Sequence, residues 1–198
     1  MKTVNTTLTT TALFSDDGKK RYLLRKEWDA SKPSLAIIML APSEASGIHL
    51  DSTTLLVLNN ASRLGFGSVS ILNLFATLND FSLTNAEEDD AENLKEIIHE
   101  AKKCDSFVYA PGVGKANNHN FQARSKQILE QLKKYEDKLY CISDKSGMVK
   151  FVHPLTPCVR EWNLQQFKVS ELVNDISVVE PKTDRKGSRS CIQKNTLP

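Results

Sequence analysis

The residues that could carry chemistry in this 198-residue chain follow short apolar runs. The first run, Ile37 to Leu40, leads at once into a proline, a hydroxyl, two carboxylates and an imidazole: Pro42, Ser43, Glu44, Asp51 and His49. Carboxylates and imidazoles can exchange protons with a substrate, so Glu44 and Asp51 are candidates for an acid–base pair. A loop with a helix cap is the competing interpretation, because aspartate is a favoured N-cap residue.

Polar residues and glycines also follow the later apolar runs. Asn73 ends the second run, Gly112 follows the third, and His153 comes shortly after the fourth. A side-chain amide offers a paired donor and acceptor, and an imidazole can donate a proton or a hydrogen bond. Each could instead bond to a neighbouring loop. The glycines near Lys115 lack the spacing of a phosphate-binding P-loop, and the chain has no GxSxG nucleophile elbow.

Strand and helix patterns alternate along the chain. Apolar or β-branched runs predict strands at 6–15, 21–28, 35–40, 68–73, 106–110 and 138–143, and amphipathic patterns predict helices at 53–64, 86–104 and 120–135. We expect an α/β fold, a three-layer sandwich around a central, mainly parallel four-stranded sheet, with an N-terminal β-hairpin. Ligands of such sheets bind beyond the carboxyl ends of the strands, where the polar residues above would meet.

The charge is unevenly distributed. The formal net charge is +2, but residues 181–198 hold five basic residues against one aspartate, so +5 − 1 = +4, and residues 1–180 sum to +2 − 4 = −2. We expect a single α/β domain over residues 1–180 and a basic, disordered tail over 181–198. A mildly acidic domain lacks the basic footprint that proteins binding duplex DNA usually have.

Other classes of protein are excluded by composition. The N-terminal stretch has threonines where a secretory signal has apolar residues, and no run approaches the roughly 20 apolar residues of a membrane span. The four cysteines are scattered, without CxxC spacing. We therefore expect a cytoplasmic protein with no membrane association, no metal site and no cofactor, whose oligomeric state stays open.

The order of several motifs resembles a bacterial family labelled domain of unknown function 1643. The motifs are RYLLRKEWD, IIMLAPSEA, LDSTT, GFGSVSILNLFA and DKSGMVKFVHPL, which together span about Arg21 to Leu155. This chain departs from the family pattern at Ala41, where members have Asn, and at Pro111, where members have Trp. If those residues contact substrate in relatives, this chain has a shifted specificity or none.

The same motif order is similar to that of the uracil-DNA glycosylase superfamily. That resemblance implies a glycosylase-like fold in which Asn73 reads the base and His153 polarises the base carbonyl. It also implies an aromatic residue that stacks on the base, for which Phe75 and Phe81 are candidates.

The resemblance also implies a role for the first loop, which would position water or the sugar. The most active glycosylases have an aspartate there that this chain lacks, and Glu44 or Asp51 would substitute for it. We thus expect the catalytic residues His153, Asp51 and Glu44, and the substrate-binding residues Pro42, Ser43, Asn73, Phe75 and Gly112.

These features together predict a protein that binds a nucleobase- or nucleotide-sized ligand at the strand ends. The partner would be a small molecule or DNA, and an enzyme of this kind would cleave an N-glycosidic bond. The first alternative is a non-catalytic nucleotide- or nucleic-acid-binding protein, which Ala41 and the missing aspartate favour. The second is a small-molecule hydrolase or transferase unrelated to DNA, which the acidic domain favours.

Overall fold

A computed structural model describes residues 1–43, 48–83, 90–112 and 114–172 of the chain. The strands are β1 (Thr9–Phe14), β2 (Arg21–Glu27), β3 (Ser34–Met39), β4 (Ser68–Asn73), β5 (Ser106–Tyr109), β6 (Leu139–Ser143) and β7 (Asn163–Gln166). The helices are α1 (Ser52–Arg63), α2 (Ala91–Lys103), α3 (His119–Leu132) and the 3-10 helix η1 (Lys133–Lys138). The expected tail over 181–198 lies outside the described residues. Within them, no helix has the length and apolar character needed to cross a bilayer.

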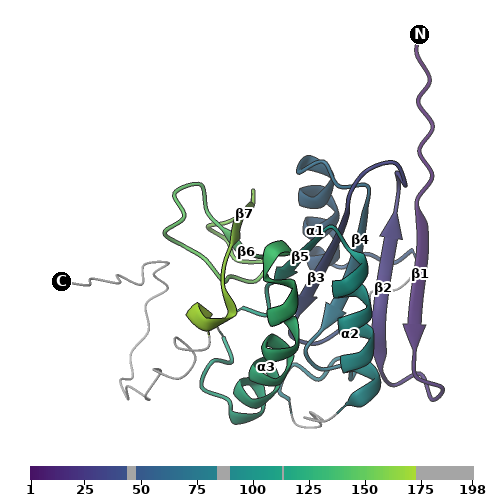
Figure 1. Cartoon of the computed structure of the whole chain (residues 1–198). Coiled ribbons are helices and arrows are strands. Elements are labelled where there is room, and N and C mark those ends of the chain that lie inside the picture. The colour runs from purple at the N-terminus through teal and green to yellow at the C-terminus, as the bar shows by residue number, and fades with distance from the viewer. Residues whose placement is uncertain (44–47, 84–89, 113, 173–198) are drawn as a thin grey trace.

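All seven strands join in one sheet with the order β1-β2-β4-β3-β5-β6-β7 (Figure 1). β3 pairs in parallel with both β4 and β5, and β5 pairs in parallel with β6. β1, β2 and β7 are added in antiparallel orientation. The α/β class is therefore confirmed, but the sheet is mixed and has seven strands, so it is larger than the mainly parallel four-stranded sheet that we expected. The sequence pattern does not predict β7, because its residues Asn-Leu-Gln-Gln are mostly polar.

Helices cover both faces of the sheet, because its central strands are apolar on both sides. On one face, Val57 of α1 belongs to the same buried cluster as Ile37 and Ile71. On the other, Ile97 of α2 and Ile128 of α3 belong to a second buried cluster, with alternate residues of the same strands. Figure 1 shows α2 and α3 in front of the sheet and α1 behind it. The two cores hold the strand ends in fixed positions.

The helices begin where side chains cap their first N–H groups. Asp51 Oδ1 accepts a hydrogen bond from the Thr54 N–H at 2.6 Å and caps α1. Asp90 Oδ1 accepts one from the Asn93 N–H at 3.0 Å and caps α2. Because Asp90 is the cap, α2 begins after it and not at residue 86 as the sequence pattern predicted. Residues 84–89 lie outside the described part of the chain.

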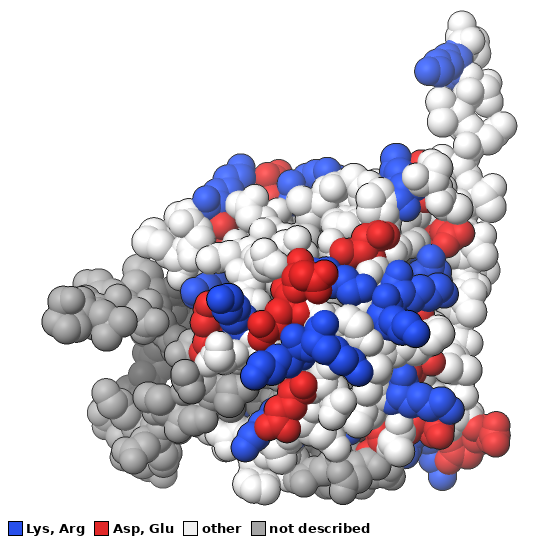
Figure 2. All heavy atoms as spheres, in the orientation of Figure 1, with Lys and Arg blue, Asp and Glu red and all other residues white. Residues whose placement is uncertain are grey.

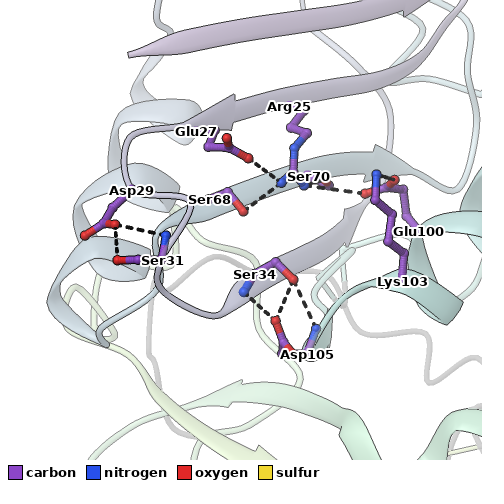
Figure 3. Close-up of polar contacts among 10 residues, drawn as sticks. All are labelled: Arg25, Glu27, Asp29, Ser31, Ser34, Ser68, Ser70, Glu100, Lys103 and Asp105. Atoms are coloured by element: carbon purple, nitrogen blue, oxygen red, sulfur yellow. Dashed lines mark hydrogen bonds and ion pairs between the residues drawn. The ribbon is translucent and has the colours of Figure 1, made fainter. Parts of the chain in front are cut away.

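A polar network connects α2 to β2 and β4 (Figure 3). Arg25 donates hydrogen bonds to the hydroxyls of Ser68 and Ser70, each at 3.1 Å, and to Glu27 Oε2 at 2.7 Å. Its guanidinium also lies 4.0 Å from the carboxylate of Glu100, which is 3% exposed. Since a buried carboxylate needs a compensating charge, Arg25 stabilises the packing of α2 on the sheet.

Replacing Arg25 with methionine should reduce the free energy of unfolding by about 1–2 kcal/mol. The substitution keeps the aliphatic volume but leaves the buried Glu100 carboxylate without the guanidinium. Urea denaturation followed by circular dichroism would measure the change. Lys32→Ala, which removes an exposed ion pair with Asp29, is the control and should change stability by less than about 0.5 kcal/mol. Equal effects of the two substitutions would contradict a stabilising role for Arg25.

Candidate functional site

The loops that follow β3 and β4 lie side by side at the carboxyl edge of the sheet. Backbone pairing continues past the strand ends, where the Leu74 N–H donates to the Met39 carbonyl at 2.8 Å. Further on, the Asn79 N–H donates to the Pro42 carbonyl at 2.9 Å. The first polar loop is therefore attached to the loop that follows Asn73.

Asp51 is hydrogen-bonded through both carboxylate oxygens. Its Oδ2 accepts a hydrogen bond from the Ser43 hydroxyl, and its Oδ1 accepts the capping bond from the Thr54 N–H. Burial raises the pKa of Asp51, but the hydrogen bonds from Ser43 and Thr54 and the charge of Arg21 outweigh it, so the pKa lies below its ordinary value. Asp51 is therefore ionised, and its contacts are those of a helix cap that also orients Ser43.

Arg21 reaches this cluster because of an irregularity in the first hairpin. The pairing of β1 with β2 shifts register at Tyr22, which has no partner residue on β1. A β-bulge of this kind changes the direction in which the neighbouring side chains point. Arg21 is 2% exposed and donates a hydrogen bond to the Ser43 carbonyl at 3.2 Å. Its guanidinium therefore supplies positive charge close to Asp51.

Asn73 is the most unusual polar residue at this edge. Its side chain lies on the α1 side of the sheet, because Ile71, two residues earlier in β4, belongs to the core on that side. It is 1% exposed, and among the described residues neither its Nδ2 nor its Oδ1 has a hydrogen-bond partner. Each buried group left in this way costs about 1–3 kcal/mol. Such an amide calls for an explanation beyond packing.

Two buried polar side chains hold the backbone at Asn73 from the opposite face. Asn93 of α2 donates through Nδ2 to the carbonyls of Asn73 and Leu74, at 3.1 and 3.0 Å. Arg124 of α3 donates through Nε to the Leu74 carbonyl at 3.0 Å and through a terminal nitrogen to the Asp90 carbonyl at 3.2 Å. The position of Asn73 is thus determined by the two helices on the other side of the sheet.

His153 is half-buried in the connection between β6 and β7. Its Nδ1 accepts a hydrogen bond from the Leu155 N–H at 3.2 Å, so a neutral ring carries its proton on Nε2. Burial lowers the pKa of His153 below the ordinary 6.5, and the negative charge of Asp51 offsets this only in part. The imidazole is therefore neutral near pH 7 and offers one N–H donor.

Glycine is required where the loop after β5 meets His153. Gly112 has a φ of +79°, and a Cβ at this position would lie 3.0 Å from the Cβ of His153. Phe151 adopts a φ of 58° and packs edge-on against Phe167, with ring centroids 4.9 Å apart. These features hold the backbone of the His153 loop against the end of β5.

Only some of the expected site residues lie together at the carboxyl edge. Those that the structure places there are Pro42, Ser43, Asp51, Asn73, Gly112 and His153. Phe75 also follows β4, but it is 2% exposed and belongs to the core beneath α2 and α3, so its ring has no free face for stacking on a base. Phe81 is 50% exposed. Glu44 lies outside the described residues.

Three residues that support the site are absent from the sequence-based list: Arg21, Asn93 and Arg124. Asn93 lies four residues before the buried Ile97, and Arg124 lies four residues before the buried Ile128. Residues four apart share a helix face, so both are polar residues on an apolar stripe. That pattern in the sequence could have predicted that their side chains are buried. Arg21 had no comparable signal, because the bulge that orients it arises from strand pairing.

A cavity of about 370 Å³ lies at the opposite edge of the sheet, between η1 and the end of β7. Its lining includes Glu136, Asp137 and Gln166, and Gln166 Nε2 donates to the backbone carbonyls of the other two, at 3.1 and 2.9 Å. It is thus separate from the polar residues at the carboxyl edge. In the part of the chain that the structure describes, no group of three or more His, Cys, Asp or Glu could hold a metal ion.

Gly112→Ala should destabilise the protein by about 1–3 kcal/mol, because the added methyl both strains the positive φ and presses on His153. Gly114→Ala is a matched control, since a Cβ there meets nothing within 4 Å. Thermal denaturation of both variants would measure the difference. Similar melting temperatures for the two would show that the close approach of Gly112 to His153 is unimportant.

Stability should decrease as the pH falls below about 6.5. Because the pKa of His153 is lower in the folded state, the unfolded chain binds the additional proton between the two pKa values, which favours unfolding. Urea denaturation of native protein and His153→Gln between about pH 5.5 and 7.5 tests this. The variant should lose less stability over that range than the native protein does. Parallel curves for native protein and His153→Gln would contradict the assignment.

Comparison with known proteins adds one finding to this geometry. The family model described as "Protein of unknown function (DUF1643)" matches residues 21–155, which is more than half of the chain. No curated protein and no solved structure matches the chain. The match begins at Arg21 and ends two residues after His153, so it includes all the residues gathered at the carboxyl edge. The chain belongs to the DUF1643 family.

Proposed function

We propose that the carboxyl edge of the sheet binds a nucleobase, presented as a free base, a nucleoside or part of a nucleic acid. The observation that carries this proposal is the buried amide of Asn73, whose donor and acceptor both lack a partner among the described residues. A nucleobase edge offers a matching acceptor and donor side by side, so one ligand would satisfy both groups. Hydrogen bonds to the ligand would then offset the free-energy cost of burying the amide.

His153 supplies the second contact in this proposal. Its neutral ring presents an Nε2–H, which can donate a hydrogen bond to a carbonyl oxygen of the base. N-glycosidic cleavage is the reaction class that this donor fits. The bond between the base nitrogen and the sugar carbon breaks, the base leaves with the electron pair, and water adds its oxygen to the sugar carbon. A donor at the base carbonyl stabilises the negative charge that develops there.

A non-catalytic binding protein is the second candidate, and a specific observation favours it. Hydrolysis needs a group that orients or deprotonates water, and Asp51 is a candidate because its negative charge acts on His153. Both of its oxygens already accept hydrogen bonds, from Ser43 and Thr54. With Asp51 engaged in this way, a base would bind without turnover.

The burial of Asn73 has a kinetic consequence for both candidates. An amide that is 1% exposed can reach a ligand only after the surrounding loops move apart. Association would then be slower than for a preformed site, because binding requires a conformational change. The same closure would exclude water from the bound base.

Asn73→Ala should reduce affinity for a base-containing ligand about tenfold or more, with little loss of stability. The substitution removes two polar groups that have no partner in the described part of the chain, so the free energy of unfolding should stay within about 1 kcal/mol of the native value or increase. Calorimetry with free bases, nucleosides and short single-stranded DNA measures binding, and urea denaturation measures stability.

Two matched asparagine variants make this test specific. Asn93→Ala removes an amide that donates to two carbonyls, so it should cost about 1–3 kcal/mol of stability. Asn59→Ala alters an exposed asparagine of α1 and should change neither quantity. Absence of binding by the native protein to every base-containing ligand would overturn the proposed function. Release of free base from a bound nucleoside would decide for the enzyme over the binding protein.

A further inference from the structure

The two edge strands of the sheet differ in length. β1 is six residues long, pairs with β2 alone among the described strands, and has five exposed residues. Thr10 is its one half-buried residue, and Lys26 Nζ lies 3.0 Å from the Thr10 hydroxyl. β7, at the other edge, has only four residues. β1 thus presents both its faces and its free edge to solvent.

β1 also lacks the features that usually protect a strand edge. Natural edge strands avoid association through charged side chains, prolines, bulges or short length. The first 14 residues contain one charged residue, Lys2, and no proline. Leu8, Leu13 and Phe14 are 48%, 43% and 40% exposed. The register shift lies in β2 at Tyr22, so the free edge of β1 keeps its regular form.

The segment before β1 continues in the same direction. Residues 1–8 are all exposed and extend away from the body of the protein in line with β1 (Figure 1). Five of the residues from Thr6 to Thr11 are threonines, whose β-branched side chains favour extended structure. We call residues 1–8 the N-terminal arm. The arm and β1 together form an extended, nearly uncharged segment.

We propose that two copies of this chain associate by antiparallel pairing of this segment. A two-fold axis perpendicular to the sheet, passing through Thr9, would place Thr7 opposite Thr11 and Val4 opposite Phe14. Such cross-strand pairs of threonines and of apolar residues are favourable. Lys2 falls outside the paired stretch, so self-association brings no like charges together. The two bodies would lie on opposite sides of the new ladder, and the two sheets would become one.

The area that a stable dimer requires explains why the arm is needed. Stable interfaces bury about 800 Å² on each partner. Six residues of β1 span only about 20 Å, whereas residues 4–14 span about 37 Å. Pairing of the longer segment also covers the exposed side chains of Leu8, Leu13 and Phe14, which apolar burial favours.

Light scattering after size-exclusion chromatography tests the proposal. The full chain has a mass of 22.2 kDa, so the native protein should elute with twice that mass at concentrations of about 10–100 µM. Leu13→Lys places a charge on the exposed strand, and deletion of residues 2–8 removes the arm without disturbing the folded body. Both variants should be monomeric with unchanged circular dichroism, Leu13→Lys at 22.2 kDa and the deletion variant at a slightly lower mass. Gln165→Lys, on exposed β7, is the control and should remain dimeric.

A crosslinking experiment tests the register separately from the mass. Thr9→Cys, in a Cys158→Ser, Cys191→Ser background, would place two thiols next to each other across the two-fold axis, within the Cα separation that a disulfide requires. Oxidation should crosslink this variant efficiently and Leu13→Cys poorly. The proposal is overturned if the native protein is monomeric throughout this range, or if it forms dimers that survive both the β1 charge and removal of the arm. None of these outcomes depends on nucleobase binding.

Discussion

The parallel pairing of β3 with both β4 and β5 is the constraint on which the rest of the structure depends. It places the carboxyl ends of three strands, and of β6 beside them, at the same edge of the sheet. Every polar loop then meets its neighbours there, although Pro42 and His153 are 153 − 42 = 111 positions apart in sequence. At the amino edge, the same pairing brings the start of β3 to the start of β5, where Asp105 accepts hydrogen bonds from Ser34.

Among the described residues, several buried polar side chains have a single atom without a hydrogen-bond partner, such as Asn93 Oδ1 and Trp162 Nε1, whereas Asn73 has two. Asn93 and Arg124 are buried and donate to backbone carbonyls at the end of β4. Arg25 similarly compensates Glu100 between α2 and the sheet. Asn73 is supported by this arrangement, yet its own amide is unpaired among the described residues. Rigid support of an unsatisfied group is the pattern of a preorganised recognition residue, because the cost of burial is already included in the folded state.

The candidate site and the candidate interface use different physical properties of the same sheet. At the carboxyl edge, the helix cap at Asp51, the bulge at Tyr22 and the glycine at 112 direct single polar groups toward one region. Along β1, a regular uncharged edge offers a row of backbone donors and acceptors, which selects for another strand and not for a small ligand. The bulge joins the two, since it orients Arg21 without altering the outer edge.

The sequence by itself determined the α/β class, the hairpin and the approximate positions of the helices, because local periodicity and turn residues encode them. It also identified Ser43, Asp51, Asn73 and His153 as strand-end polar residues. Only the tertiary structure decided that Phe75 packs in the core, that β7 extends the sheet and that Arg21 joins the Ser43–Asp51 cluster. The reason is that these features depend on strand register and on which face of the sheet a side chain meets, and pairing between distant segments sets both.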